Sequence, residues 1–71
     1  MVWFFERDGN FIRCETRESP SHAGFELVIL EPDGSERVEE FADSQSLDAR
    51  QRELQSTLGH DGWQGPFGRT I

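Results

Sequence analysis

The segment Phe25-Glu26-Leu27-Val28-Ile29-Leu30 is the longest nearly unbroken apolar run in the chain. It lies between Ala23-Gly24 and Pro32-Asp33-Gly34. Its length and its branched and aromatic residues indicate a strand that is buried largely on both faces. The other segments can then be placed as neighbours of this strand or as its cover.

The residues before this segment predict a hairpin. Residues 2–7 and 10–17 are predicted strands, and Asp8-Gly9 between them is a signal for a two-residue type I′ turn. Such a turn places Arg7 opposite Asn10. In that register one face of the hairpin is wholly apolar, and we assign it to the core: Trp3, Phe5, Ile12 and Cys14.

A second hairpin is predicted from residues 25–31 and 35–42, with a turn around Pro32-Asp33-Gly34. A three-residue loop places Phe25 opposite Phe41 and Val28 opposite Val38. A two-residue loop at Asp33-Gly34 would instead place Ile29 opposite Val38. We favour the three-residue loop because proline suits the second position of a type I turn and glycine the left-handed position that follows.

A helix is predicted over residues 44–58, with Asp43 as its N-cap. Its apolar stripe is narrow and fits one sheet face; it consists of Leu47, Leu54 and Leu58, completed by Gln51. Gly59 is the predicted C-cap residue. Residues 60–71 form a Gly-rich tail, and we expect Trp63 to fold back and close one end of the core.

These elements predict an α+β fold: a four-stranded antiparallel meander (β-β-β-β-α) with one C-terminal helix packed on one face and a Gly-rich tail. Residues 1–71 are expected to form a single small domain. Strand 2–7 would then be an edge strand without inward charge, which invites pairing with another chain. The opposite edge strand is guarded by acidic side chains: Glu36, Glu39 and Glu40.

The segment from Phe25 to Trp63 carries a strand, a Pro-Asp-Gly turn, an acidic strand, a leucine-spaced helix and a Gly-Trp ending. In this order it resembles short uncharacterised bacterial proteins with a four-stranded antiparallel sheet and one C-terminal helix. That resemblance covers over half of the chain and implies no activity. The layout is also similar to the ββββα domain of single-strand-binding transcriptional coactivators. That family uses basic sheet faces, whereas this chain is acidic, so nucleic-acid binding does not follow from the resemblance.

The net charge of the chain is −7 at pH 7. The acidic excess lies in residues 18–43, which hold eight acidic residues against Arg37, while the segments on either side balance. An acidic surface repels phosphates, which makes nucleic acid an unfavourable partner. No apolar run is long enough to cross a bilayer, and residues 1–9 lack the basic leader of a signal peptide. We therefore expect a cytoplasmic protein that does not enter a membrane.

The small size of the chain limits the stability that its core can supply. A chain of this length buries only about 60% of its unfolded surface. Cys14 is the only cysteine, so no internal disulfide can form, and with His22 and His60 it makes a poor set of metal ligands. We expect no metal and no cofactor. Oligomerisation, or a compact core rich in aromatics, is then the extra source of stability.

No set of side chains predicts catalysis. Glu39 and Glu40 are adjacent on a strand, so their carboxylates point to opposite faces and cannot share a substrate. Cys14 lies on the core face, where a free cysteine behaves as a small hydrophobe. The chain shows no nucleophile elbow and no Gly-rich phosphate loop, and it is nearly too short to enclose a pocket. We expect that the protein is not an enzyme and has no catalytic residues.

The face opposite the predicted core carries large groups that one helix cannot cover. Phe4, Phe11, Arg13 and Val28 lie on this face, and we predict that they form an interaction surface. The favoured function is a small non-enzymatic binding or assembly domain. Its expected partner is a second copy, which gives a homodimer, or an unknown protein.

Three alternatives are open for the same face, and in the first of them its phenylalanines are simply exposed. A single-strand nucleic-acid-binding module would use its two phenylalanines together with Arg13 and Arg17. The tail could instead cover the face within one chain through Trp63 and Phe67. Salt dependence separates nucleic-acid binding from a dimer interface, because only the former weakens steeply with salt.

Overall fold

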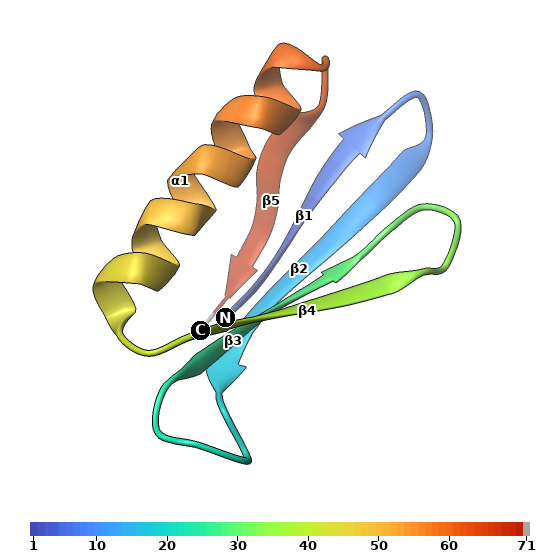
Figure 1. Cartoon of the computed structure of the whole chain (residues 1–71). Helices are drawn as coiled ribbons and strands as arrows, with labels where there is room; N and C mark the ends of the chain where they lie inside the picture. Colours follow the sequence, from blue (N-terminus) through green and yellow to red (C-terminus); the bar gives the residue numbers. More distant parts are fainter. Residues whose placement is uncertain (71) are drawn as a thin grey trace.

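The computed structural model describes residues 1–70 of the chain and the side chains of residues 1–68. Ile71, the last residue of the predicted tail, lies outside the described residues. The elements in chain order are β1 (Val2–Arg7), β2 (Asn10–Glu18), β3 (Phe25–Leu30), β4 (Glu36–Phe41), α1 (Ser44–His60) and β5 (Gln64–Thr70). The strands of the described chain form one antiparallel sheet in the order β4-β3-β2-β1-β5 (Figure 1).

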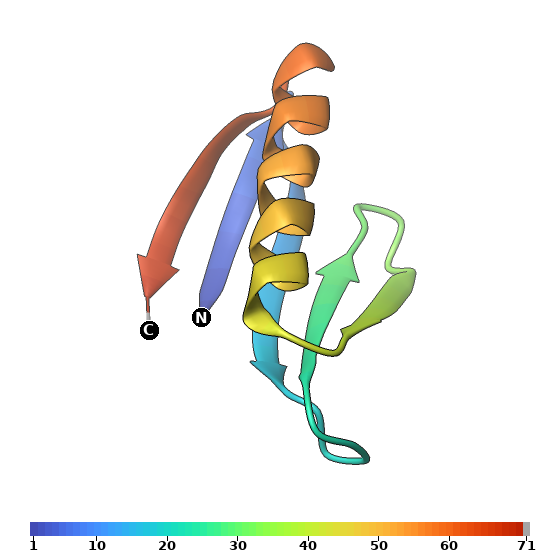
Figure 2. The ribbon, with the colours of Figure 1, turned by 60° about the vertical axis from the view of Figure 1, so that its left-hand side comes forward.

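The sheet has five strands, so the prediction of a four-stranded meander that ends in a helix and a tail was wrong. The α+β class and the antiparallel meander of the first four strands are confirmed. β4 ends at one edge of the sheet, and α1 carries the chain across to the opposite edge, where β5 pairs with β1 (Figures 1 and 2). β1 is therefore an interior strand and not the open edge that the sequence predicted.

β5 pairs with β1 despite residues that disfavour strands. It contains two glycines and Pro66, and its register with β1 is irregular on both sides of the pair Phe4 and Phe67. Proline is tolerated in an edge strand, because an N–H that faces solvent is not needed for the ladder. The irregular register and the proline also make β5 a poor template for a further strand.

Both predicted hairpin registers are confirmed. β1 and β2 pair with Arg7 opposite Asn10, and Asp8 and Gly9 have the positive φ values of 53° and 82° that a type I′ turn requires. β3 and β4 pair with Phe25 opposite Phe41. This is the register of the three-residue loop that Pro32 favoured.

The core lies between the sheet and α1, as predicted. Six side chains from β1, β2 and β3 and three leucines of the helix form one buried cluster: Trp3, Phe5, Ile12, Cys14, Leu27, Ile29, Leu47, Leu54 and Leu58. The alternation of side chains along each strand turns these residues to the helix and their neighbours to the other face. Figure 2 shows α1 on a single side of the sheet.

The N-terminus of α1 is capped as the sequence predicted, whereas its C-terminus is not. At the start, Asp43 is the N-cap, as predicted, because its Oδ1 accepts from the backbone N–H of Ser46 at 2.8 Å. At the end, Gly59 lies inside the helix, so its prediction as the C-cap was wrong. The chain turns instead at Gly62, whose φ is 88°.

The turn at Gly62 brings Trp63 onto the core. The backbone N–H of Gly62 donates to the carbonyl of Gly59, and that of Trp63 donates to the carbonyl of Leu58 at 2.9 Å. This pair of bonds, with an apolar contact between the residue after the glycine and the last turn, is the Schellman motif. Trp63 packs against the core cluster, which confirms the predicted fold-back, and the guanidinium of Arg7 lies 4.8 Å from its ring centroid.

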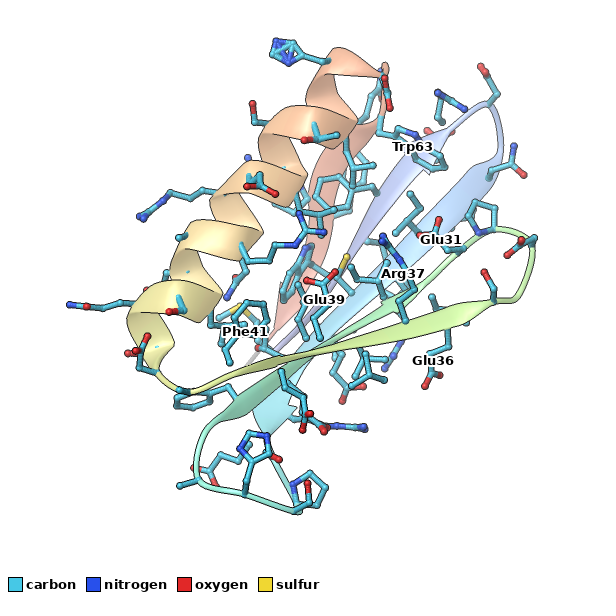
Figure 3. All side chains as sticks on the ribbon, in the orientation of Figure 1. Glu31, Glu36, Arg37, Glu39, Phe41 and Trp63 are labelled. Carbon is cyan, nitrogen blue, oxygen red and sulfur yellow. The ribbon has the colours of Figure 1, made fainter. Side chains whose placement is uncertain are left out.

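Ion pairs hold the polar edge strand β4 beneath the helix. Arg50 of α1 donates to both carboxylate oxygens of Glu39, at 2.7 and 3.1 Å. This contact lowers the pKa of the Glu39 carboxyl. Arg37 of the same strand pairs with Glu31 at 3.1 Å, and Figure 3 shows Glu39 nearer to the helix than Arg37 and Glu31. The acidic edge is thus partly neutralised on the helix side.

Candidate interaction surface

The face of the sheet opposite α1, here called the open face, carries every second side chain of each strand. The antiparallel registers place Phe67, Phe4 and Arg13 in one row across β5, β1 and β2. The same row continues to Leu30 and Glu36 on β3 and β4. No helix among residues 1–70 lies on this face (Figure 2).

One half of the open face is aromatic. Phe11 is 57% exposed and Phe67 is 48% exposed, and Phe4 is half-buried between them. These three residues come from the neighbouring strands β2, β5 and β1, and are called the aromatic patch below. They line a hollow of about 600 Å³ together with Glu6 and Gly68. A contiguous apolar group of this kind is what marks interaction sites on small soluble proteins.

The other half of the open face is ionic. Arg13 pairs with Glu15 at 3.3 Å, and Arg17 pairs with Glu26 at 2.9 Å. Glu26 is the buried member of the second pair, so Arg17 supplies the charge that a buried carboxylate needs. Both arginines therefore have carboxylate partners within the chain.

Loop residue His22 extends the ionic half to the outer strand. Its Nε2 lies 2.7 Å from Glu40 Oε1 on β4, and its Nδ1 lies 2.9 Å from the carbonyl oxygen of Ala23. The carbonyl of Ala23 and the carboxylate of Glu40 raise the pKa of His22. The protonated ring can donate to both acceptors, so the loop is held to the sheet more firmly when His22 is charged.

Of the four predicted surface residues, Val28 is not accessible. Phe4, Phe11 and Arg13 lie together on the open face, but Val28 is only 4% exposed. It lies between Glu15 and Val38 in the register of the sheet, so it has a neighbouring strand on each side. Val38, on the edge strand β4, is 46% exposed, so it is the accessible valine of this pair.

Phe67 is a surface residue that the sequence offered only in the alternative in which the tail covers the open face. That alternative is wrong, because residues 64–70 form β5 and extend the open face with a further exposed ring. Pro66, its neighbour, faces the helix side, where it lines a groove with Trp3 and helix residues. Neighbouring residues on a strand point to opposite faces, so a strand at this position would have predicted Phe67 on the open face. The glycines on either side, Gly65 and Gly68, disfavour a strand and hid this signal.

The other chemically interesting residues lie apart from this surface. Burial raises the pKa of the Cys14 thiol to about 12, so it is protonated at neutral pH and is a poor nucleophile. Glu39 pairs with the helix and Glu40 with His22, on opposite faces of β4, as the alternation predicted. Among residues 1–70, no group of three or more His, Cys, Asp or Glu side chains is arranged to hold a metal ion.

The comparisons with known proteins find no relative from which a function could be inferred. The chain matches no protein-family model, and no curated protein and no solved structure matches it. The structure shows an antiparallel sheet of five strands with one helix, and the comparisons give no support for either resemblance drawn from the sequence. In the part of the chain that the structure describes, no helix is long and apolar enough to span a membrane.

Proposed function

We propose that this protein is a small non-enzymatic binding or assembly domain that self-associates through the aromatic half of its open face. The observation that carries this proposal is the aromatic patch, because two of its three rings are about half exposed on a face that α1 leaves uncovered. Exposed aromatic side chains favour a partner surface that removes them from water. The small core of the chain adds a reason for assembly, since it has little stability to spare.

The division of the open face limits how two copies would pack. Two sheets that meet face to face about a two-fold axis bring the same patch of each copy into contact only if the axis runs through that patch. With the axis through the aromatic patch, rings pack on rings. If the two-fold axis ran through the middle of the sheet, the aromatic rings of one copy would face the ionic half of the other copy. We therefore favour an offset dimer in which the ionic halves stay in water.

The size of the aromatic half predicts a weak dimer. A stable interface takes about 800 Å² from each partner. The accessible surface of the whole chain is 4627 Å², so such an interface would use about a sixth of it. The aromatic patch has only three rings, of which Phe4 is half-buried, and the net charge of −7 makes two copies repel each other. Association should be strongest at high salt, which screens this repulsion.

The test is the molar mass in solution, measured by light scattering and sedimentation equilibrium over a concentration series. Phe11→Glu combined with Phe67→Glu should give a monomer, because it puts charges into the interface at positions that are solvated in the monomer. Val38→Glu is the control for each substitution, since it adds one negative charge, as each Phe→Glu change does, at a similarly exposed position in the ionic half of the face. A wild-type chain that is monomeric at high micromolar concentration would refute self-association.

A second candidate function is single-strand nucleic-acid binding through the same patch. It is favoured by three phenylalanines on adjacent strands with Arg13 beside them, which is a platform on which bases could stack. The carboxylate partners of Arg13 and Arg17 and the net charge weigh against it. Binding of a labelled single strand that weakens steeply with salt would support this function over the first.

A further inference from the structure

The hollow in the aromatic patch has a carboxylate in its wall. It is lined by the rings of Phe4, Phe11 and Phe67, by Glu6 and by Gly68. Glu6 lies on the same strand and the same face as Phe4, and directly opposite Phe11 in the register of β1 and β2. None of the lining residues is basic. The hollow thus combines three aromatic rings with one negative charge.

Local contacts hold these walls in position. The backbone N–H of Gly9, in the turn after β1, donates to Glu6 Oε2 at 3.0 Å, which orients the carboxylate. Gly68 lies against the ring of Phe4: a Cβ at this position would be 3.4 Å from Phe4 Cδ2. Phe67 is the partner of Phe4 in the register of β1 and β5. The hollow is therefore formed before any ligand arrives.

We propose that this hollow binds an organic ammonium group, such as a quaternary ammonium or a methylated lysine side chain. The faces of aromatic rings carry partial negative charge and attract cations, and sites for quaternary ammonium groups are built from several rings. A methylated ammonium has apolar methyl groups that contact the rings, and it keeps the positive charge that Glu6 can balance.

The electrostatics of the chain select this class of ligand over others. The net charge of −7 attracts cations and repels anions such as phosphates. A neutral apolar group would gain contact with the rings but would leave Glu6 without a counter-charge. A metal ion would find only one carboxylate among the lining residues, which is too few ligands.

The same hollow lies within the proposed self-association surface, and this connects the two inferences. A second copy packed on the aromatic patch would cover the hollow, so a ligand and a second copy exclude each other. A ligand that binds only the uncovered form shifts the population towards monomers. Only this competition rests on the proposed function, because ligand binding itself needs a single chain.

The experiment is a titration of the ¹⁵N-labelled full chain with choline, followed by amide chemical shifts, and a parallel titration with 3,3-dimethylbutan-1-ol. The alcohol has the same shape as choline but no charge. Choline should shift amides of β1, β5 and the start of β2, with half-saturation on the order of millimolar. The alcohol should bind at least about tenfold more weakly if charge contributes as the site suggests.

Three variants test the parts of the site. Phe11→Leu keeps an apolar side chain but removes a ring face, and it should weaken choline binding about two- to fivefold. Glu6→Gln should weaken it by removing the carboxylate while keeping a similar shape. Val38→Leu, on the ionic half of the same face, is the control and should leave choline binding unchanged. Equal binding of choline and the alcohol, or no effect of Glu6→Gln, would overturn the proposal.

Light scattering in the presence of choline keeps the two proposals distinguishable. A chain that is monomeric throughout but binds choline at the patch refutes self-association and supports this inference. A dimer that dissociates as choline is added supports both. A dimer or a monomer whose mass and amide shifts do not respond to choline at about 100 mM, far above the expected half-saturation, overturns this inference.

Discussion

Replacement of Leu54 by alanine tests the placement of the helix on the sheet. Leu54 is 6% exposed and belongs to the cluster that joins α1 to β1, β2 and β3. The change removes three buried carbon atoms. At about 0.8 kcal/mol for each, the lost free energy of transfer from water is about 2.4 kcal/mol. The cavity that is left adds to this, and the total for buried leucines is about 2–5 kcal/mol.

Such a loss is a large part of the stability of so short a chain. At about 0.05–0.15 kcal/mol per residue, the free energy of unfolding is about 4–11 kcal/mol. Urea denaturation followed by far-UV circular dichroism and tryptophan fluorescence measures the change. With a slope of about 1 kcal/mol per molar urea, the midpoint should fall by about 2 M or more.

Two further variants keep the measurement interpretable. Leu54→Val leaves a smaller cavity and serves if Leu54→Ala is already unfolded in buffer. Gln55→Ala is the matched control, because Gln55 is the exposed neighbour on the same helix and its replacement should change stability by less than about 0.5 kcal/mol. A loss below about 0.5 kcal/mol for Leu54→Ala, equal to that of the control, would show that this face of the helix does not contact the sheet.

Three other predictions concern single residues. Gly59→Ala should raise the stability by about 0.5–1 kcal/mol, since Gly59 is helical with open space around it; a loss in urea denaturation would mean that Gly59 ends the helix after all. Cys14 should react with a disulfide reagent such as DTNB only as fast as the chain unfolds, and immediate reaction of the native protein would contradict its burial. His22 should titrate above its ordinary pKa in an NMR pH series, and Glu40→Gln should lower that pKa. Because the folded pKa is raised, the stabilising contribution of His22 is complete below its ordinary pKa and is lost as the pH rises through the raised value; an unchanged pKa in Glu40→Gln would refute the ion pair.

The residues that the sequence identified correctly are those whose structure depends on near neighbours. The turn at Asp8-Gly9 fixes the register of the first hairpin, because a two-residue type I′ turn matches the twist of the strands. From that register, simple alternation assigns Trp3 and Phe5 to the core and Phe4 to the open face. Asp43 caps the helix through a bond that spans three residues. Each of these features is decided within about ten residues of chain.

The fifth strand and its effect on the surface were decided by tertiary structure. Residues 64–70 have little intrinsic preference for a strand, since glycine and proline are depleted in sheets. They form β5 because α1, packed through its leucines, brings the chain to the edge of β1, where pairing satisfies backbone groups that would otherwise lack a partner in the sheet. This pairing places Phe67 beside Phe4 and completes the aromatic patch. In the same way, Val28 is hidden by the strands on either side of it, so alternation gives its face but not its accessibility.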